Sequence, residues 1–561
     1  MSESSLIDSV QDTAVVEWVI RNVPTWLNKK DLAKALEREG IHFVCLKKLH
    51  GWDYSFISFC SEEDAKEAKL VFANQKIKGF QFELEQARNV NKKRKHTEYL
   101  QKVDERIKQV KYSMIKEESG NILKRSVADV VAPWRHYSYA EQIRRKRSAI
   151  LAVLAKVTSS LKSQTESGSL TWLKSLKKRP CCNLESLIDM PEEEGARLFY
   201  RNKNEFTIGF SYKDDGTPIE TVGFALGLFR EGEIRVDSVN DECVTTSKRA
   251  IAIANILEVF IRSSQLRAYD KRTHKGFWRQ VIVREGFRTK EVLVLLQVQT
   301  EGFERNLIDE ETRRMVDFLV SSCQSNELEV HGVVLQEHNG VSNFIPTDKS
   351  PCTLFGQTYF HEKLMDLTFR IGSLSFFQTN TFAAERLLDV ILELGELTSH
   401  STVLDLCCGT GTIGMCLASK VAQVIGIELV EEAVNDAKVN MERNNIQNMT
   451  VLAGKVEDKL KAAIHLCRSS QIVAIADPPR AGLHPSVIKT LRNVVKIKRL
   501  IYISCNPANF VGNAVGLCRP KSNAFRGEPF RPIRAIGVDM FPYTEHVELV
   551  TLFHRIESDT K

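Results

Sequence analysis

The pattern of apolar and polar positions divides the chain into segments with different secondary-structure periods. Residues 13–88 predict elements in the order strand, helix, strand, strand, helix, strand. Residues 131–372 alternate short β-rich runs with helices, whereas residues 373–561 alternate apolar strands with helices, as in a mainly parallel sheet. Residues 89–130 are highly charged. We therefore expect an α/β protein with an N-terminal domain, a charged helical linker, a central α+β domain and a C-terminal doubly wound domain.

The N-terminal segment carries aromatic residues on its predicted third strand, YSFISF, at Tyr54, Phe56 and Phe59. Together with the order of elements, these aromatics resemble those of an RNA-recognition motif, in which side chains of the sheet stack on bases. Val19 occupies the place of the motif's aromatic residue on the first strand. We predict this fold for residues 13–88, with Tyr54 and Phe56 as candidate RNA contacts and a docking module as the alternative role.

Composition and charge narrow the classes of protein without choosing one. The 561 residues are 43% hydrophobic and 27% charged, which is typical of a globular protein, and no apolar run is long enough to span a membrane. The first residues do not resemble a secretion signal, so we expect a protein of the cytosol or nucleus with reduced cysteines. We also expect the protein to be monomeric. The net charge of +7 permits a nucleic-acid partner. The KKRKH run within 89–130 is either a nuclear-import signal or a solvated helix face.

Two basic and aromatic stretches of the central segment, 200–206 and 275–288, have the residue types that hold phosphates and stack on bases. The candidate RNA contacts in these stretches are Arg201, Lys203, Arg279 and Arg284. The sequence has no CxxC pair and no HExxH spacing, and the adjacent Cys181 and Cys182 lack the spaced partners of an iron–sulfur cluster. We therefore expect no metal site.

The first turn of the C-terminal segment contains GTGTIG at 409–414, between a predicted strand and a predicted helix. Glycines in such a turn let the backbone approach a ligand closely. The next predicted strand ends at Glu428, where a carboxylate can accept hydrogen bonds from both hydroxyls of a ribose. This pattern fits a dinucleotide and S-adenosyl-L-methionine equally well.

Two later strands end in residues that can carry chemistry. One ends at Asp477, which is followed by Pro-Pro-Arg, so that Arg480 stands where amino-group methyltransferases carry an aromatic ring. The next strand ends just before Cys505. Because the carboxyl ends of parallel strands face one crevice, we expect Asp477 and Cys505 in the same pocket. If the last strand is antiparallel, its start brings Glu548 to that pocket, and a thiol beside a carboxylate suggests a nucleophile and a base.

Methylation of uracil at C5 needs such a pair, because C5 is only weakly nucleophilic. Addition of a thiolate at C6 produces an enolate whose C5 can attack a methyl sulfonium. A base must afterwards remove the C5 proton so that the thiol can leave. Cys505 and Glu548 have the chemistry that these two steps require.

Six ordered motifs of the chain are similar to those of the RNA (uracil-5-)-methyltransferases. They are SFFQTN (375–380), LDLCCGTG (404–411), GIEL (426–429), DPPRAGLHP (477–485), ISCNP (503–507) and DMFPYTEHVE (539–548). The resemblance implies a Rossmann-like domain with one antiparallel strand, S-adenosyl-L-methionine as cofactor, and the T-loop uridine of tRNA as substrate. It makes Cys505 the nucleophile and Glu548 the proton acceptor, with Arg480 as a candidate RNA contact. The implied cofactor contacts are Gln378, Glu428, Asp477, Cys407, Gly409, Gly411 and Thr412.

Other functions remain open at this point. A tRNA-binding or folding factor whose methylation is dispensable would have no chemical need for Cys505 and Glu548 together. A nicotinamide oxidoreductase built on the glycine-rich turn would leave the DPPR, SCNP and HVE sequences without a role. Because no residue pattern identifies the target nucleotide, methylation of uridine in another RNA is a further alternative.

Overall fold

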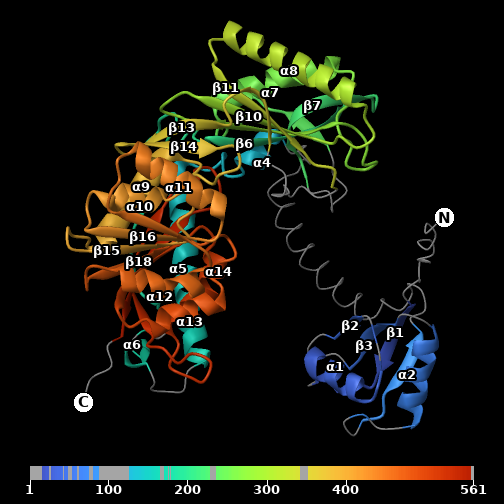
Figure 1. The fold of residues 1–561 in the computed structure, drawn as a ribbon, viewed down its shortest axis with the longest axis vertical. Helices are drawn as coiled ribbons and strands as arrows, with labels where there is room; N and C mark the ends of the chain where they lie inside the picture. Colours follow the sequence, from blue (N-terminus) through green and yellow to red (C-terminus); the bar gives the residue numbers. More distant parts are fainter. Residues whose placement is uncertain are drawn as a thin grey trace, which may run out of the picture. The chain divides into compact units, whose positions relative to one another are not determined.

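The computed structural model describes residues 16–86, 126–164, 170–227, 235–340 and 351–556, with short gaps inside the first and third ranges. The chain forms two compact units, residues 1–123 and 124–561 (Figure 1). Among the described helices, none has the length and apolar content needed to cross a membrane. The KKRKH run and the rest of the predicted linker up to residue 125 lie outside the described residues.

The N-terminal unit has the predicted order of elements and a four-stranded antiparallel sheet, in the order β2-β3-β1-β4. Its elements are β1 (Val16–Arg21), α1 (Lys29–Arg38), β2 (Cys45–Lys47), β3 (Ser55–Phe59), α2 (Glu62–Asn74) and β4 (Glu83–Gln86). The core lies between the sheet and the two helices, because apolar residues of all these layers pack together. The assignment of this unit as an RNA-recognition motif stays a prediction.

The aromatic residues at β3 lie on two different faces. Tyr54 and Phe56 are half-buried, with ring centroids 5.7 Å apart and nearly perpendicular planes, and the Arg21 guanidinium lies 5.7 Å from the Tyr54 ring. Phe59 is fully buried in the core. Grouping Phe59 with the other two aromatics was therefore wrong: it is three residues from Phe56, and side chains of a strand alternate between faces.

The central domain is built on a seven-stranded mixed sheet in the order β12-β11-β10-β9-β6-β7-β8, in which only β10 and β11 are parallel among the described pairs. Its strands are β6 (Lys203–Tyr212), β7 (Pro218–Ala225), β8 (Val236–Ser238), β9 (Trp278–Glu285), β10 (Val292–Val298), β11 (Val330–Glu337) and β12 (Cys352–Gly356). Its helices are α4 (Val127–Val131), α7 (Lys248–Ser263) and α8 (Arg305–Ser325), with α7 and α8 packed together against the sheet (Figure 1).

Strand β10 is buried on both faces and joins two cores. Val292 and Val294 pack in the core with α7 and α8, whereas Leu293 and Leu295 pack in the core that includes helix α9 (Thr381–Gly395). The hairpin β13 (Tyr359–Leu364) and β14 (Leu367–Gly372) belongs to this second core and leads into α9. The period of two along β10 therefore links the central domain to the C-terminal domain.

The C-terminal domain contains an eight-stranded sheet in the order β17-β16-β15-β18-β19-β21-β20-β5. Its strands are β15 (Thr402–Leu406), β16 (Gln423–Glu428), β17 (Met449–Ala453), β18 (Ile472–Ala476), β19 (Ile497–Ser504), β20 (Phe530–Val538), β21 (Glu548–Arg555) and β5 (Asn183–Ile188). The other helices of this domain are α10 (Thr412–Ala418), α11 (Glu431–Arg443), α12 (Val456–Leu466), α13 (Pro485–Asn493) and α14 (Pro507–Cys518). Only β21 runs antiparallel to its neighbours, so the predicted mainly parallel sheet with one antiparallel strand is confirmed.

The prediction that the C-terminal domain consists of residues 373–561 alone needs a correction, because elements within residues 139–188 also belong to this domain. Strand β5 pairs in parallel with β20 at the edge of the eight-stranded sheet. Helix α5 (Tyr139–Gln164) packs against α14, and the short α6 (Thr171–Lys174) lies between α5 and β5 in the chain. The apolar side chains of α5 that enter this core are Ile150, Leu154, Val157 and Leu161. Their helical spacing predicts a buried face but does not tell which domain covers it.

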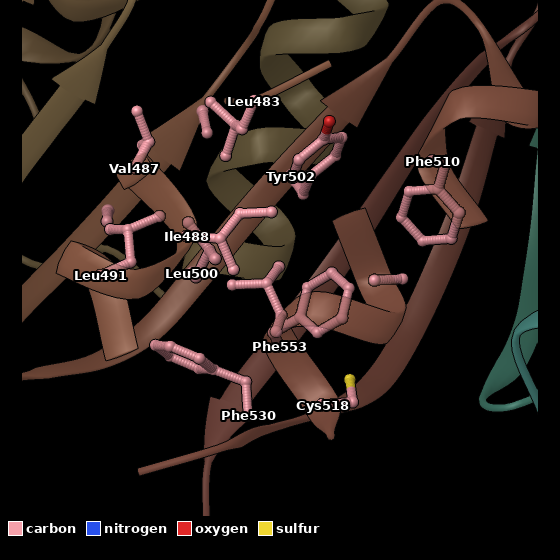
Figure 2. Packing of buried hydrophobic residues seen from close by; sticks show 14 of the residues in the cluster. Leu483, Val487, Ile488, Leu491, Leu500, Tyr502, Phe510, Cys518, Phe530 and Phe553 are labelled. Atoms are coloured by element: carbon pink, nitrogen blue, oxygen red, sulfur yellow. The ribbon is translucent and has the colours of Figure 1, made fainter. Parts of the chain in front are cut away.

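The core on one side of this sheet holds the chain on both sides of Cys505 in place. Figure 2 shows Leu500 and Tyr502 of β19 packed among side chains of α13, α14, β20 and β21. These neighbours include Val487, Ile488, Leu491, Phe510, Phe530 and Phe553. Cys505 follows β19 directly and precedes α14, so its backbone is positioned by two well-packed elements.

Candidate active site

The predicted chemical residues meet at one edge of the eight-stranded sheet. Glu428 ends β16, Asp477 follows β18 and Cys505 follows β19. Strand β15 pairs in parallel with β16 and with β18, and β18 pairs in parallel with β19, so all these strands end at the same edge. Glu548 begins β21 and pairs with Val538 of β20. Because β21 is antiparallel, its first residue lies at the edge where the parallel strands end.

The Glu428 carboxylate accepts two backbone hydrogen bonds, one of them from the glycine-rich turn after β15. The backbone N–H of Gly409 donates to Glu428 Oε2 at 2.9 Å, and that of Val430 donates to Oε1 at 2.9 Å. Gly409 has a φ of 54°, and a Cβ added there would meet no heavy atom within 4 Å. A Cβ at Gly411 would instead lie 2.7 Å from Met415 Cε. Gly409 therefore has open space on its Cβ side, whereas Gly411 has a φ of 78°, a conformation that favours glycine.

A pocket lies beside this turn, with about 600 Å³ of space that includes open solvent. Five of the predicted cofactor contacts line it, namely Gln378, Asp477, Cys407, Gly409 and Thr412. Glu428 and Gly411 are not among its lining residues, and Glu428 reaches the rim through its hydrogen bond from Gly409. We call this cavity the glycine-turn pocket.

Asp405 and Phe376 are site residues that our sequence predictions missed. Asp405 lies inside the apolar strand β15, is fully buried and accepts a hydrogen bond from the Gly414 N–H at 2.9 Å. Among the described residues, its Oδ1 has no hydrogen-bond partner. Phe376 lines the glycine-turn pocket although its side chain is 67% exposed. An acid within an apolar strand was a signal for Asp405, whereas an exposed phenylalanine gives no such signal in a sequence.

The acidic groups of this edge affect one another and the thiol. Burial raises the pKa of Asp405 and that of Asp477 to about 7. Burial, followed by the charge of Asp477, also raises the pKa of Glu548, whose Oε2 has no hydrogen-bond partner among the described residues. Burial raises the pKa of Cys505 to about 11, and Glu548 and Asp477 add to this rise, while Arg480 opposes it. The site therefore favours a cationic ligand and keeps the isolated thiol protonated.

The central domain holds the segment that carries Gln378. Asn202 Nδ2 donates to the Gln378 carbonyl at 2.8 Å, and Arg284 Nη1 donates to the carbonyls of Gly372 and Ser375 at 2.6 and 2.7 Å. Gln378 Nε2 in turn lies 3.4 Å from Asp477 Oδ2. Asn202, just before β6, and Arg284 of β9 thus help to determine where Gln378 meets the acidic edge of the sheet.

Two of the predicted RNA contacts are structural residues instead. Arg284 is 1% exposed, and burial lowers its pKa to about 10. Arg279 is also buried and donates to the carbonyls of His338 and Gly340 at 2.9 and 2.7 Å. The prediction that these two arginines bind RNA was wrong, because their guanidinium groups are directed to backbone carbonyls inside the protein.

The remaining predicted RNA contacts of this unit are accessible to different degrees. Arg480 is exposed and Arg201 is half-buried. Lys203 pairs with Glu205 at 2.8 Å, with its side chain 35% exposed. Their contact with RNA stays a prediction.

A second, wider hollow of about 1060 Å³ opens beside Cys505, and we call it the Cys505 cleft. It is lined by Trp134, Arg145, Ala149, Arg480, Cys505, Asn506, Pro507, Glu545 and His546. Asp477, which acts electrostatically on Cys505, lines the glycine-turn pocket. Two ligands bound in the two cavities would therefore meet near Cys505 and Asp477. No group of three or more His, Cys, Asp or Glu side chains that could hold a metal ion occurs in the part of the chain that the structure describes.

The parallel sheet and its glycine-rich turn define a Rossmann-like α/β domain. A similar fold occurs in the crystal structure of the Pyrococcus abyssi tRNA (uracil-54, C5)-methyltransferase in complex with S-adenosyl-L-homocysteine. The two structures align with a TM-score of 0.52 and 23% sequence identity, over 75% of this chain and 84% of the archaeal one.

Sequence comparison identifies the family. The family model of tRNA (uracil-5-)-methyltransferases matches residues 343–556. The mouse tRNA (uracil-5-)-methyltransferase homolog A is 33% identical over 564 residues, which cover 99% of this chain and 86% of the mouse protein. The human homolog A is 37% identical over 441 residues, which cover 77% of this chain and 68% of the human protein. The chain belongs to the tRNA (uracil-5-)-methyltransferase family.

Proposed function

We propose that this protein transfers a methyl group from S-adenosyl-L-methionine to C5 of the T-loop uridine of tRNA. One observation carries the proposal beyond family membership. The Cys505 thiol lines the Cys505 cleft, and two acids act electrostatically on it: the buried Glu548, and Asp477, which lines the glycine-turn pocket. A methyl donor in the pocket and a nucleobase in the cleft would therefore meet near Cys505 and Asp477.

The glycine-turn pocket fits the cofactor chemically. The open side of Gly409 leaves room for a ligand close to the backbone, and the apolar residues Phe376 and Leu387 line the same space as Asp477. Glu428 would accept from the ribose, because each carboxylate oxygen can accept more than one hydrogen bond. When bound, S-adenosyl-L-methionine supplies an electrophilic methyl group and a positive charge beside the acidic edge.

Cys505 would begin the reaction by adding to C6 of the uracil ring. The thiol loses its proton, the sulfur–C6 bond forms, and the electron pair of the C5–C6 double bond moves to the oxygen on C4. The exposed Arg480 supports this step, since its positive charge opposes the rise in the pKa of Cys505. C5 of the resulting enolate would then form a bond to the methyl carbon as the bond between that carbon and the cofactor's sulfur breaks, which leaves S-adenosyl-L-homocysteine.

Glu548 would complete the reaction as the base. It removes the C5 proton, the C5–C6 double bond forms again, and the C6–sulfur bond breaks to release the Cys505 thiolate. Burial and the charge of Asp477 raise the pKa of Glu548, which makes its carboxylate a stronger base. Its Oε2 has no hydrogen-bond partner among the described residues and is thus available to accept the proton.

The test is a covalent adduct with tRNA that carries 5-fluorouridine at the target position. Fluorine cannot leave as a cation, so in the presence of S-adenosyl-L-methionine the wild-type protein should remain attached to this RNA in a denaturing gel. Cys505→Ala should form no adduct, whereas Cys352→Ala, which changes an exposed cysteine of β12, should behave as wild type. If wild type methylates tRNA but forms no adduct, and Cys505→Ala remains active, the proposed chemistry is wrong.

A further inference from the structure

The Cys505 cleft has walls from segments that lie far apart in the sequence. One wall consists of Trp134 and the start of α5 with Arg145. The opposite wall includes Arg480, after β18, and His546, in the loop before β21. Helix α5 therefore faces the same cavity as the candidate nucleophile, although more than half of the chain separates them in the sequence.

Buried polar contacts fix the two walls relative to each other. Lys146, next to Arg145 on α5, pairs with Asp539 at 2.6 Å, and both side chains are fully buried. Lys146 Nζ also donates to the Phe541 carbonyl at 2.9 Å, and the Tyr139 hydroxyl donates to Asp539 Oδ2 at 2.9 Å. Separating α5 from the 539–547 loop would leave a buried charge without its partner, which is costly. The cleft is thus a preformed feature of the fold.

The walls combine cations with aromatic rings. The Arg145 guanidinium lies 3.8 Å from the centre of the Tyr137 ring, and its side chain is 41% exposed. Arg145 shares one carboxylate, Glu141, with the neighbouring Arg144, so the pair of arginines retains a net positive charge. Burial lowers the pKa of His546, the carboxylate of Glu545 raises it, and the charges of Arg480, Lys146 and Arg201 lower it. Lys146 is paired with Asp539, so the cleft combines the arginines Arg145 and Arg480 with one acidic lining residue, Glu545.

We propose that the Cys505 cleft binds the RNA strand beside the target nucleotide, and that Arg145 contacts a phosphate of this strand. The proposal rests on the proposed function, because a uridine that reacts with Cys505 must leave its base stack and enter the cleft. The phosphates on either side of a flipped nucleotide then come close to the rim. A guanidinium that already stacks on Tyr137 is well suited to hold a phosphate, and Arg480 is placed to contact a second phosphate from the opposite wall.

The adjacent arginines of α5 provide a matched pair of variants. Arg144 and Arg145 both bind Glu141 and are both exposed, but only Arg145 is among the described residues that line the cleft. We expect Arg145→Gln to weaken binding of tRNA roughly threefold at low salt and to reduce the slope of log affinity against log salt by about 0.7–0.9, the value of one phosphate contact. Arg144→Gln should retain the wild-type affinity and slope. Arg145→Lys keeps the charge and should retain the slope.

Binding is measured with the full chain by fluorescence anisotropy, and the fluorinated RNA assay is run on the same preparations. If Arg145→Gln and Arg144→Gln bind tRNA alike while wild type forms the adduct, the role of Arg145 is wrong and the proposed function stands. If Arg145→Gln shows the expected smaller slope of log affinity against log salt but wild type forms no adduct, the cleft binds RNA and the proposed chemistry is wrong. A thermal unfolding curve equal to that of wild type shows that the variant is folded, and Arg145→Glu, with an expected larger loss of affinity, provides an independent check.

Discussion

The acidic edge of the eight-stranded sheet and the middle of the seven-stranded sheet both contain ionisable side chains in buried positions, but these side chains have different partners. At the edge, Asp405, Asp477 and Glu548 are all acids, and burial raises their pKa values. In the central sheet, Glu285 pairs with Arg249 at 2.6 Å, and Arg284 donates to backbone carbonyls.

A buried charge with an opposite partner or several hydrogen bonds is consistent with a structural role. A cluster of buried acids is costly to ionise unless a ligand of opposite charge binds beside it. The acidic edge therefore fits a site for a cationic ligand, and the arginines of the central sheet position the segment that leads to this site.

The largest expected effect is at Glu548, a buried acid whose Oε2 has no hydrogen-bond partner among the described residues. Glu548→Gln retains the shape of the side chain and removes the base, so we expect multiple-turnover methylation of tRNA to slow by about 10²–10⁴-fold. A covalent adduct with ordinary tRNA should accumulate, because release of the thiol stalls. Glu545→Gln, an exposed residue of the Cys505 cleft, is the control and should accumulate no adduct. Slow turnover of Glu548→Gln without an adduct would exclude its role as the base.

The structural role of the central arginines predicts a loss of stability. Arg284→Met removes hydrogen bonds from a buried guanidinium to three backbone carbonyl groups, and the free energy of unfolding of the larger unit should fall by about 3 kcal/mol. Urea denaturation measures this change, and the exposed Arg313→Met should remain within about 0.5 kcal/mol of wild type. Unchanged stability of Arg284→Met would show that the hydrogen bonds of this buried arginine do not stabilise the protein.

Glu428 lies at the acidic edge but is engaged by two backbone N–H groups, so its replacement tests whether it also binds the cofactor. Glu428→Ala should weaken the affinity for S-adenosyl-L-methionine by about tenfold or more, from the loss of roughly 1.5–3 kcal/mol. Isothermal calorimetry measures this affinity, and Glu432→Ala on the exposed first turn of α11 is the control. An unchanged affinity in a folded Glu428→Ala protein would remove this residue from the site.

The smallest expected effect concerns the charge that Glu548 exerts on Cys505. Alkylation by iodoacetamide requires the thiolate, so alkylation of Cys505 should be slow at pH 8 and should accelerate as the pH rises toward its pKa of about 11. Glu548→Gln removes a carboxylate that raises the pKa of Cys505 when it is ionised, so alkylation should become faster at the pH values where Glu548 is ionised. Peptide mass spectrometry follows Cys505 separately from the other cysteines. Equal rates in Glu548→Gln and in the Glu545→Gln control would show that the two groups do not interact.

The chemical half of the site could be predicted from the sequence because it depends on a local rule. Residues that follow the apolar strands β18 and β19 must lie at the carboxyl edge of a parallel sheet, which brings Asp477 and Cys505 together. Glu548 required the further assumption that β21 is antiparallel, and the structure confirms this direction. The roles of these residues in the reaction stay predictions.

The sequence could not show which of the basic residues are exposed and which are buried. Arg279 and Arg284 stand in an aromatic and basic stretch that is typical of RNA-binding surfaces, yet both are buried. Burial depends on neighbours that are distant in the sequence, such as the carbonyl of Gly372 for Arg284. Residue type and spacing alone do not reveal these neighbours.

The sequence by itself determined the alternation of strands and helices, the position of the glycine-rich turn and the residues at the strand ends, because these features follow from local periodicity and backbone conformation. Only the tertiary structure decided that β5 completes the eight-stranded sheet, that Leu293 and Val294 enter different cores, and that α5 forms a wall of the Cys505 cleft. These outcomes depend on which apolar faces cover one another and on which buried charges find partners. Both depend on contacts between segments that are far apart along the chain.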